Sequence, residues 1–176
     1  MSCKTPLSDI GQFYKQIDDF RNKIINILNQ LKEKNITDCN GKIIDIDHEI
    51  KEINKYYDKL ILVKKANVRK PIELLYQYGV ASYAKEILLR DEQFFLGEVN
   101  SLTDSDKNAA DPNLNQKDLF FIAQIRLVWD HLYHVTNVKN NIWSYVQVIC
   151  LLAEKITGGN HLSGEKMRLK QIGHIL

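Results

Sequence analysis

The sequence predicts an all-α protein with an N-terminal antiparallel helical hairpin, coiled-coil-like, that packs on or extends from a helical bundle. Two observations predict this class. Apolar residues recur at steps of three and four along most of the chain, which is the period of an amphipathic helix. Only three prolines and eight glycines occur among the 176 residues, so few positions interrupt a long helix.

The first expected helix follows Thr5-Pro6, since proline is tolerated in a first turn. Its apolar residues alternate between steps of three and four over three heptads, which predicts an a/d seam. The seam residues are Ile10, Phe13, Ile17, Phe20, Ile24, Ile27 and Leu31. The pattern stops at Asn35, and Asn40 and Gly41 then favour a turn.

A second seam with the same steps follows the turn, and Asp45 and Asp47 lie in its first turn, where carboxylates complement the helix dipole. Its residues are Ile43, Ile46, Ile50, Ile53, Tyr57 and Leu60. A short connection between two seams predicts antiparallel neighbours, so residues 1–70 are expected to form the hairpin, with its helices within 8–68. A small β-hairpin at Asn40-Gly41 is the alternative for the tip. The seam is completed by itself, by the rest of the chain or by a second subunit.

Residues 71–176 are expected to form a helical bundle module. Pro71 stands at a first helical position, and apolar residues keep helical spacing from Ile72 to Ile87. Residues 100–114 are polar and acidic without periodicity, which predicts a loop.

Three further helices are expected after that loop. Residues 115–118 resemble a capping box that opens a helix ending near Val135. Asn140 or Asn141 caps the next helix, which ends at Gly158-Gly159. Ser163 opens the last helix, with Leu162 and Met167 spaced as a hydrophobic staple.

Composition and charge restrict the class of protein. The net charge of +2 gives no global attraction to nucleic acid or acidic membranes. An odd number of cysteines, three, suits a reducing compartment, and we expect a cytoplasmic location. No apolar run reaches about 18 residues, so no membrane span is expected.

The stretch from residue 126 to residue 152 is the densest in candidate chemistry. Arg126, Asp130, His134 and Asn137 fall on one narrow ridge of a helical wheel. Asp130, His131 and His134 offer two or three donors that diverge, and Asp45 and His48 suit a helix cap, so no metal or other cofactor is expected. Basic stretches at residues 59–71 and 165–176 leave nucleic acid as a weaker candidate partner.

This stretch contains Arg126, His131 and Tyr133 in the spacing Arg-x4-His-x-Tyr, which resembles the signature of HEPN-type ribonucleases. The resemblance implies a small all-α domain in which Arg126 and His131 of two protomers meet at a dimer interface. It further implies metal-independent RNA cleavage and, in a toxin subgroup, adenylylation of the tyrosine. This ribonuclease is the alternative function.

A second sequence pattern resembles helical proteins of nucleocytoplasmic large DNA viruses. It consists of Trp129-x2-Leu132 followed by Lys139-x2-Ile142-Trp143-x-Tyr145-x-Gln147. It covers about a seventh of the chain, and we carry no functional residue over from it. The two tryptophans of this pattern, Trp129 and Trp143, are explained without a catalytic role, because each supplies a large apolar surface to a core.

The hairpin seam and the lack of a complete catalytic constellation favour a non-enzymatic helical interaction or assembly protein. The second resemblance suggests a structural or virion-associated protein of a large DNA virus. Its expected partner is another protein, or a second copy of the chain, bound through helices.

Overall fold

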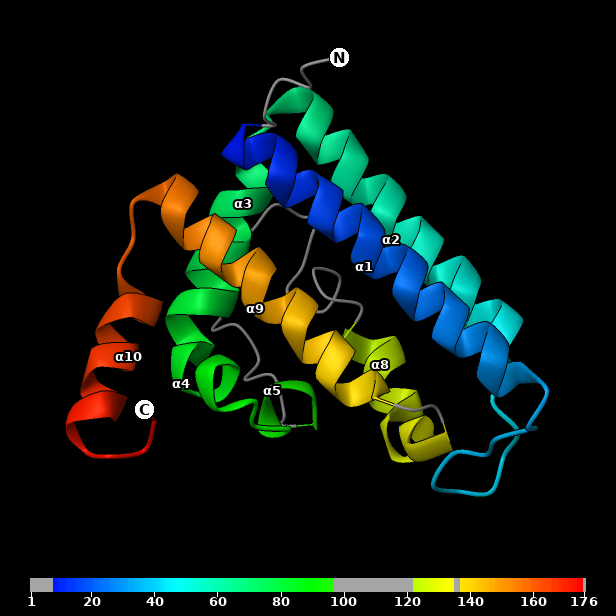
Figure 1. The fold of residues 1–176 in the computed structure, drawn as a ribbon. Coiled ribbons are helices and arrows are strands. Elements are labelled where there is room, and N and C mark those ends of the chain that lie inside the picture. The colour runs from blue at the N-terminus through cyan, green and yellow to red at the C-terminus, as the bar shows by residue number, and fades with distance from the viewer. Residues whose placement is uncertain (1–7, 97–121, 135–136, 176) are drawn as a thin grey trace, which may run out of the picture.

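The computed structural model describes residues 8–96, 122–134 and 137–175, and these residues form an all-α fold (Figure 1). No strand occurs among them, and their β pairing is limited to one isolated bridge between Thr37 and Ile43. The fold class predicted from apolar periodicity is therefore confirmed. No helix in the described ranges is both long and apolar enough to cross a bilayer.

Two long helices, α1 (Asp9–Lys32) and α2 (Ile46–Ala66), run side by side in opposite directions (Figure 1). Each begins at a capping side chain: Ser8 accepts a hydrogen bond from the amide of Gly11, and Asp45 accepts one from the amide of His48. On its other side, α1 packs along α9 (Val138–Thr157). Helix α1 therefore lies between α2 and α9.

The burial of α1 reflects its two neighbours. Six of the seven predicted seam residues are buried, and Ile10 is half-buried. Tyr14 and Leu28 are also buried although they lie off the seam, because a helix with two partners buries a wider stripe than a two-helix seam. In α2, Ile46, Ile53 and Leu60 are buried, whereas Ile50 and Tyr57 are half-buried.

The tip between α1 and α2 is a loop, and the expected start of the second seam at Ile43 is wrong. Ile43 is 62% exposed, and α2 begins at Ile46 with Asp45 as its N-cap instead of a first-turn residue. The loop is closed by the amide of Ile44, which donates to the carbonyl of Ile36 at 2.9 Å. Gly41 turns the chain with φ of +77°, a left-handed conformation that glycine adopts without a steric penalty.

The helix expected from Ile72 to Ile87 is interrupted. It consists of α3 (Lys70–Leu75), a π-helical turn (Tyr76–Val80) and α4 (Ala81–Leu89), with a kink at Tyr83. A π turn changes the angle between successive side chains, so one continuous 3.6-residue period does not describe this segment. Helix α5 (Gln93–Leu96) follows.

The polar ridge expected from Arg126 to Asn137 does not form as one helical face. Helix α8 (Ile122–Val128) gives way to a 3-10 helix (Trp129–His134), which has about three residues per turn. Asn137 has φ of +56° and precedes α9, which begins at Val138 and not at Asn140 or Asn141. The acidic loop expected at 100–114 and the helix start expected at 115–118 lie outside the described residues.

The last helix, α10 (His161–Gln171), begins two residues before the predicted Ser163. Met167 on it is exposed, so the expected hydrophobic staple with Leu162 does not form. The centre of the bundle contains an aromatic cluster in which Phe95 lies between both tryptophans, with ring centroids 4.9 Å from Trp129 and 4.9 Å from Trp143. Both tryptophans are buried, as large apolar side chains in a core are expected to be.

Candidate functional site

The residues of the HEPN-like signature have separate partners within the chain. Arg126 Nε donates to the carbonyl oxygen of Phe95 at 2.7 Å, so this guanidinium is held against α5. His131 Nε2 lies 2.8 Å from the carbonyl oxygen of Thr37 in the tip loop, and because a carbonyl only accepts, the ring donates. Tyr133 is exposed. The dimeric site that the resemblance implies stays a prediction.

The described residues contain no group of three or more His, Cys, Asp and Glu side chains placed to hold a metal ion. Asp45 and His48 meet as a helix cap, in which the Asp45 carboxylate accepts from the amide of His48 at 3.1 Å. The side chain of His134 lies outside the described part of the molecule.

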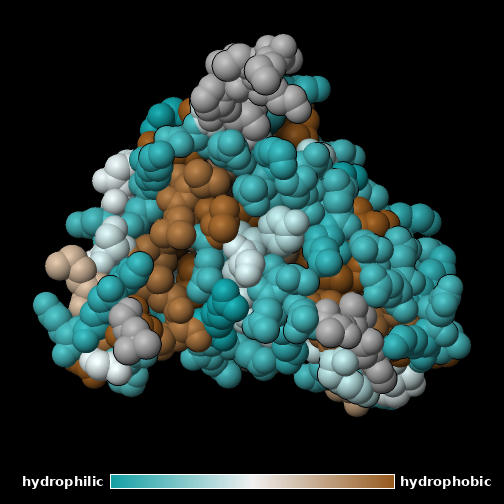
Figure 2. All heavy atoms as spheres, in the orientation of Figure 1, coloured by the Kyte–Doolittle hydropathy of each residue, from teal (hydrophilic) through white to brown (hydrophobic). Residues whose placement is uncertain are grey.

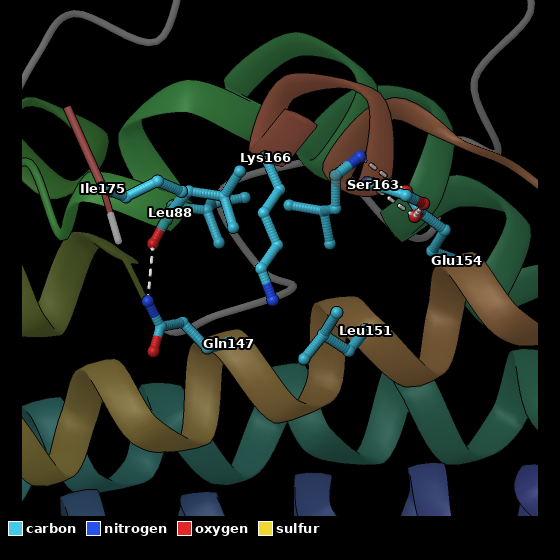
Figure 3. A pocket seen from close by; sticks show the side chains of 9 residues that line it. Leu88, Gln147, Leu151, Glu154, Ser163, Lys166 and Ile175 are labelled. Atoms are coloured by element: carbon cyan, nitrogen blue, oxygen red, sulfur yellow. Dashed lines mark hydrogen bonds between the residues drawn. The ribbon is translucent and has the colours of Figure 1, made fainter. Parts of the chain in front are cut away.

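A concavity that sequence reasoning did not anticipate lies between α4, α9 and α10 (Figure 3). We call it the α4–α9–α10 groove, and it encloses a pocket of about 450 Å³. That volume lies in the range of pockets that bind a small molecule or one or two side chains of a partner. The residues that line it are Ile87, Leu88, Gln147, Leu151, Glu154, Leu162, Ser163, Lys166 and Ile175.

Helix α9 carries two exposed apolar side chains beside the groove, and one of them, Leu151, lines it. Val148 is 41% exposed and Leu151 is 54% exposed, and the two are three residues apart on α9, so they share one helix face. Figure 2 shows a hydrophobic band over the C-terminal half of α9 and over α4, bordered by hydrophilic side chains. A contiguous apolar patch with a polar rim is typical of a binding surface.

A buried carboxylate at the edge of the groove holds α10 in place. Glu154 accepts hydrogen bonds from the amides of Leu162 and Ser163, at 2.6 and 3.0 Å, and from the hydroxyl of Ser163. These amides belong to the first turn of α10, which has no intrahelical acceptor for them. Glu154 therefore caps α10 from the preceding helix, with a negative charge at the positive end of the helix dipole.

A second contact fixes the same turn from the other side. The hydroxyl of Tyr76, the first residue of the π turn, lies 2.5 Å from Nδ1 of His161 and accepts from the amide of Asn160 at 3.0 Å. A Cβ on Gly159 would lie 1.8 Å from the Tyr76 oxygen, so the close approach requires glycine there. Two polar side chains therefore set the position of α10, and with it the width of the groove.

Two ionisable groups near the groove have shifted pKa values. A hydrogen bond from Arg168 lowers the pKa of the Glu165 carboxyl, which is therefore ionised on the rim. Burial, followed by the nearby charge of Glu154, raises the pKa of the Cys150 thiol well above its usual value. A protonated, buried thiol is a poor nucleophile, so Cys150 serves packing.

A shallower groove of about 490 Å³ lies along the α1–α2 seam, beside the half-buried Ile10 and Tyr57. Its polar groups are already engaged. The Tyr14 hydroxyl donates to the carbonyl oxygen of Val68 at 2.6 Å, and the Lys64 ammonium lies 4.2 Å from the centroid of the Tyr14 ring. Burial raises the pKa of Tyr14 well above its usual value, which keeps this hydroxyl a donor.

Sequence reasoning missed Glu154, Tyr76 and Lys166. The available signal was the Gly158-Gly159 pair, which marks a helix end but not the side chains that meet there. Comparison with known proteins adds no neighbour, because no family model, no curated protein and no solved structure matches the chain.

Proposed function

We propose that the chain is a non-enzymatic helical interaction protein that binds an amphipathic helix of a partner protein in the α4–α9–α10 groove. One observation carries the proposal: Leu151 stands exposed in the lining of a pocket with mainly apolar walls, and Val148 is exposed one turn before it on α9. An apolar side chain of the partner fills the pocket, and its neighbours one turn away cover Val148 and Leu151.

The heptad seam is the less suitable surface for a partner. Ile17, Phe20 and Ile24 at its middle are each 2% exposed or less, because they pack inside the chain. A partner could reach them only after α1 had separated from its neighbours.

The ribonuclease alternative rests on Arg126, His131 and Tyr133. The hydrogen bonds of Arg126 and His131 to backbone carbonyls of other elements give both side chains a structural role. This supports the interaction protein as the first proposal. An assembly role in a virion is a narrower form of the same proposal, in which the partner is another virion protein or a second copy of the chain.

The test uses a neutral helical probe peptide of about 15 residues, or four turns, with leucines along one face and Gln and Ala elsewhere. Its binding is measured by fluorescence anisotropy. We expect Leu151→Glu to weaken binding at least about tenfold, because the substitution removes an apolar contact and the neutral peptide would have to strip water from the new carboxylate, at a cost above about 1.4 kcal/mol.

The matched control is Leu62→Glu on α2. Leu62 is 63% exposed, similar to Leu151, but does not line the groove. This variant should bind the peptide like the wild type. Equal weakening by both variants, or no binding by the wild type, would refute the groove as the interaction surface.

A further inference from the structure

Most polar side chains around the pocket already have partners. The Glu154 carboxylate is engaged by the first turn of α10. The Gln147 amide donates to the carbonyl oxygen of Ile87 at 2.9 Å, and its oxygen accepts from Arg90 at 3.2 Å. These groups hold the walls of the groove together and have little capacity left for a ligand.

Lys166 differs from them. It is exposed on α10, and Figure 3 shows its ammonium projecting into the pocket mouth between Gln147 and Leu151. Its neighbour Glu165 is paired with Arg168 at 2.5 Å, and within the described residues no carboxylate forms an ion pair with Lys166. The pocket therefore presents apolar walls, a carboxylate (Glu154) that is already engaged by the first turn of α10, and one cation, Lys166, without an ion-pair partner in that part of the chain.

The net charge of α10 also favours an acidic ligand in the groove. It carries three basic side chains, Lys166, Arg168 and Lys170, and one acidic side chain, Glu165. A helix with basic residues beside its apolar face would be repelled by this rim, whereas a carboxylate would be attracted.

We propose that the partner helix is acidic at one defined position: it places an Asp or Glu against Lys166, one turn from the apolar side chain that fills the pocket. This inference rests on the proposed function and names the chemistry of the partner. Residues three or four apart on a helix share a face, so the recognised pattern is a large apolar residue with a carboxylate at i+3 or i+4. Pairing at the mouth of an apolar pocket excludes water partly, which strengthens the attraction relative to an open surface.

The experiment compares three probe peptides that are identical except at one position. They keep the leucine face described above and carry Glu, Gln or Lys four residues after the central leucine. Their dissociation constants are measured with the full-length chain at low and at high salt. We expect the Glu peptide to bind about three- to tenfold more tightly than the Gln peptide at low salt, and the Lys peptide to bind most weakly. The difference should shrink at high salt because the rim charges are screened.

Two variants locate the effect. Lys166→Gln should abolish the preference for Glu over Gln. Lys170→Gln removes the same charge from the same helix but does not line the pocket, and it should keep the preference.

The outcomes separate this inference from the proposed function. If the Glu and Gln peptides bind equally to the wild type, the carboxylate pairing is refuted while the groove remains the interaction surface. If none of the three peptides binds, both proposals fail. If sodium dodecanoate displaces the peptides and the peptides show no preference for Glu, the pocket takes a free aliphatic carboxylate and the acidic partner helix is refuted.

Discussion

Replacing Glu154 by alanine should loosen α10 and destabilise the protein. The carboxylate is buried and accepts three hydrogen bonds from Leu162 and Ser163, and alanine can accept none of them. The amide of Leu162 lies in a buried residue, so water cannot readily replace the carboxylate there. The amide of Ser163 belongs to an exposed residue and can turn to water.

The magnitude follows from this difference. One buried amide left without an acceptor costs about 1–3 kcal/mol, and loss of a helix cap is worth about 1 kcal/mol. Because the two effects overlap, we expect a loss of about 2 kcal/mol. For a chain of this size, 1 kcal/mol shifts the melting temperature by about 2–4 °C, so the variant should melt about 4–8 °C lower.

Thermal unfolding followed by circular dichroism measures the total loss, and hydrogen exchange locates it. The amides of the first turn of α10 should exchange faster in Glu154→Ala, while those in the middle of α1 should change only as far as global stability falls. Glu154→Gln should lose less, because its amide oxygen can accept one of the bonds.

The matched control is Glu165→Ala, which removes an exposed pair with Arg168 on the same helix and should change the melting temperature little. An unchanged melting temperature in Glu154→Ala, together with unchanged exchange in α10, would refute the capping role of Glu154.

Four further substitutions test other parts of the account. Gly159→Ala should lower the melting temperature by several degrees, about 1–2 kcal/mol, because its Cβ would displace the Tyr76 hydroxyl; unchanged melting would contradict the close approach. Trp143→Ala should cost about 3–5 kcal/mol in denaturant unfolding, since the ring fills the aromatic core. Ile24→Asp buries an unpaired charge and should lower the free energy of unfolding by several kcal/mol. An unchanged melting temperature and an unchanged oligomer size would contradict the burial of this face of α1. His131→Ala should lose only the hydrogen bond between the His131 ring and the carbonyl oxygen of Thr37 in the tip loop. We expect neither this variant nor the wild type to cleave unstructured RNA in the presence of chelator. RNA cleavage by the wild type that this variant lacks would favour the ribonuclease function instead.

The parts of the fold that follow from local periodicity could be predicted. The steps of three and four along α1 identify Phe13 to Leu31 as one buried face, and the break at Gly158 ends α9 where the sequence indicates. In both places the short-range sequence pattern and the tertiary packing favour the same structure, so the pattern alone predicts it correctly.

The interrupted helices could not be predicted in this way. The π turn at Tyr76 and the 3-10 helix after Val128 have no strong local signature, because they result from packing against distant elements. The polar ridge predicted from Arg126 onward is wrong for this reason. A helical wheel assumes 3.6 residues per turn, whereas the chain has about three residues per turn after Val128.

The candidate groove depends on contacts that no local pattern contains. Glu154 lies eight residues before the Leu162 amide that it caps, across a turn whose path is set by Tyr76. Lys166 and Leu151 line one pocket only because α10 packs against α4, next to the C-terminal part of α9. The sequence indicated a helix stop and a following helix, but not the space enclosed between them.

Hydrogen exchange with the neutral leucine-faced peptide bound is the most direct test of the central claim, that the α4–α9–α10 groove is the interaction surface. Backbone amides are measured across the chain with and without saturating peptide. We expect added protection in the C-terminal half of α9, in α10 and in α4, and none along α2. Protection confined to α1 and α2, or spread evenly over the molecule, would contradict the claim.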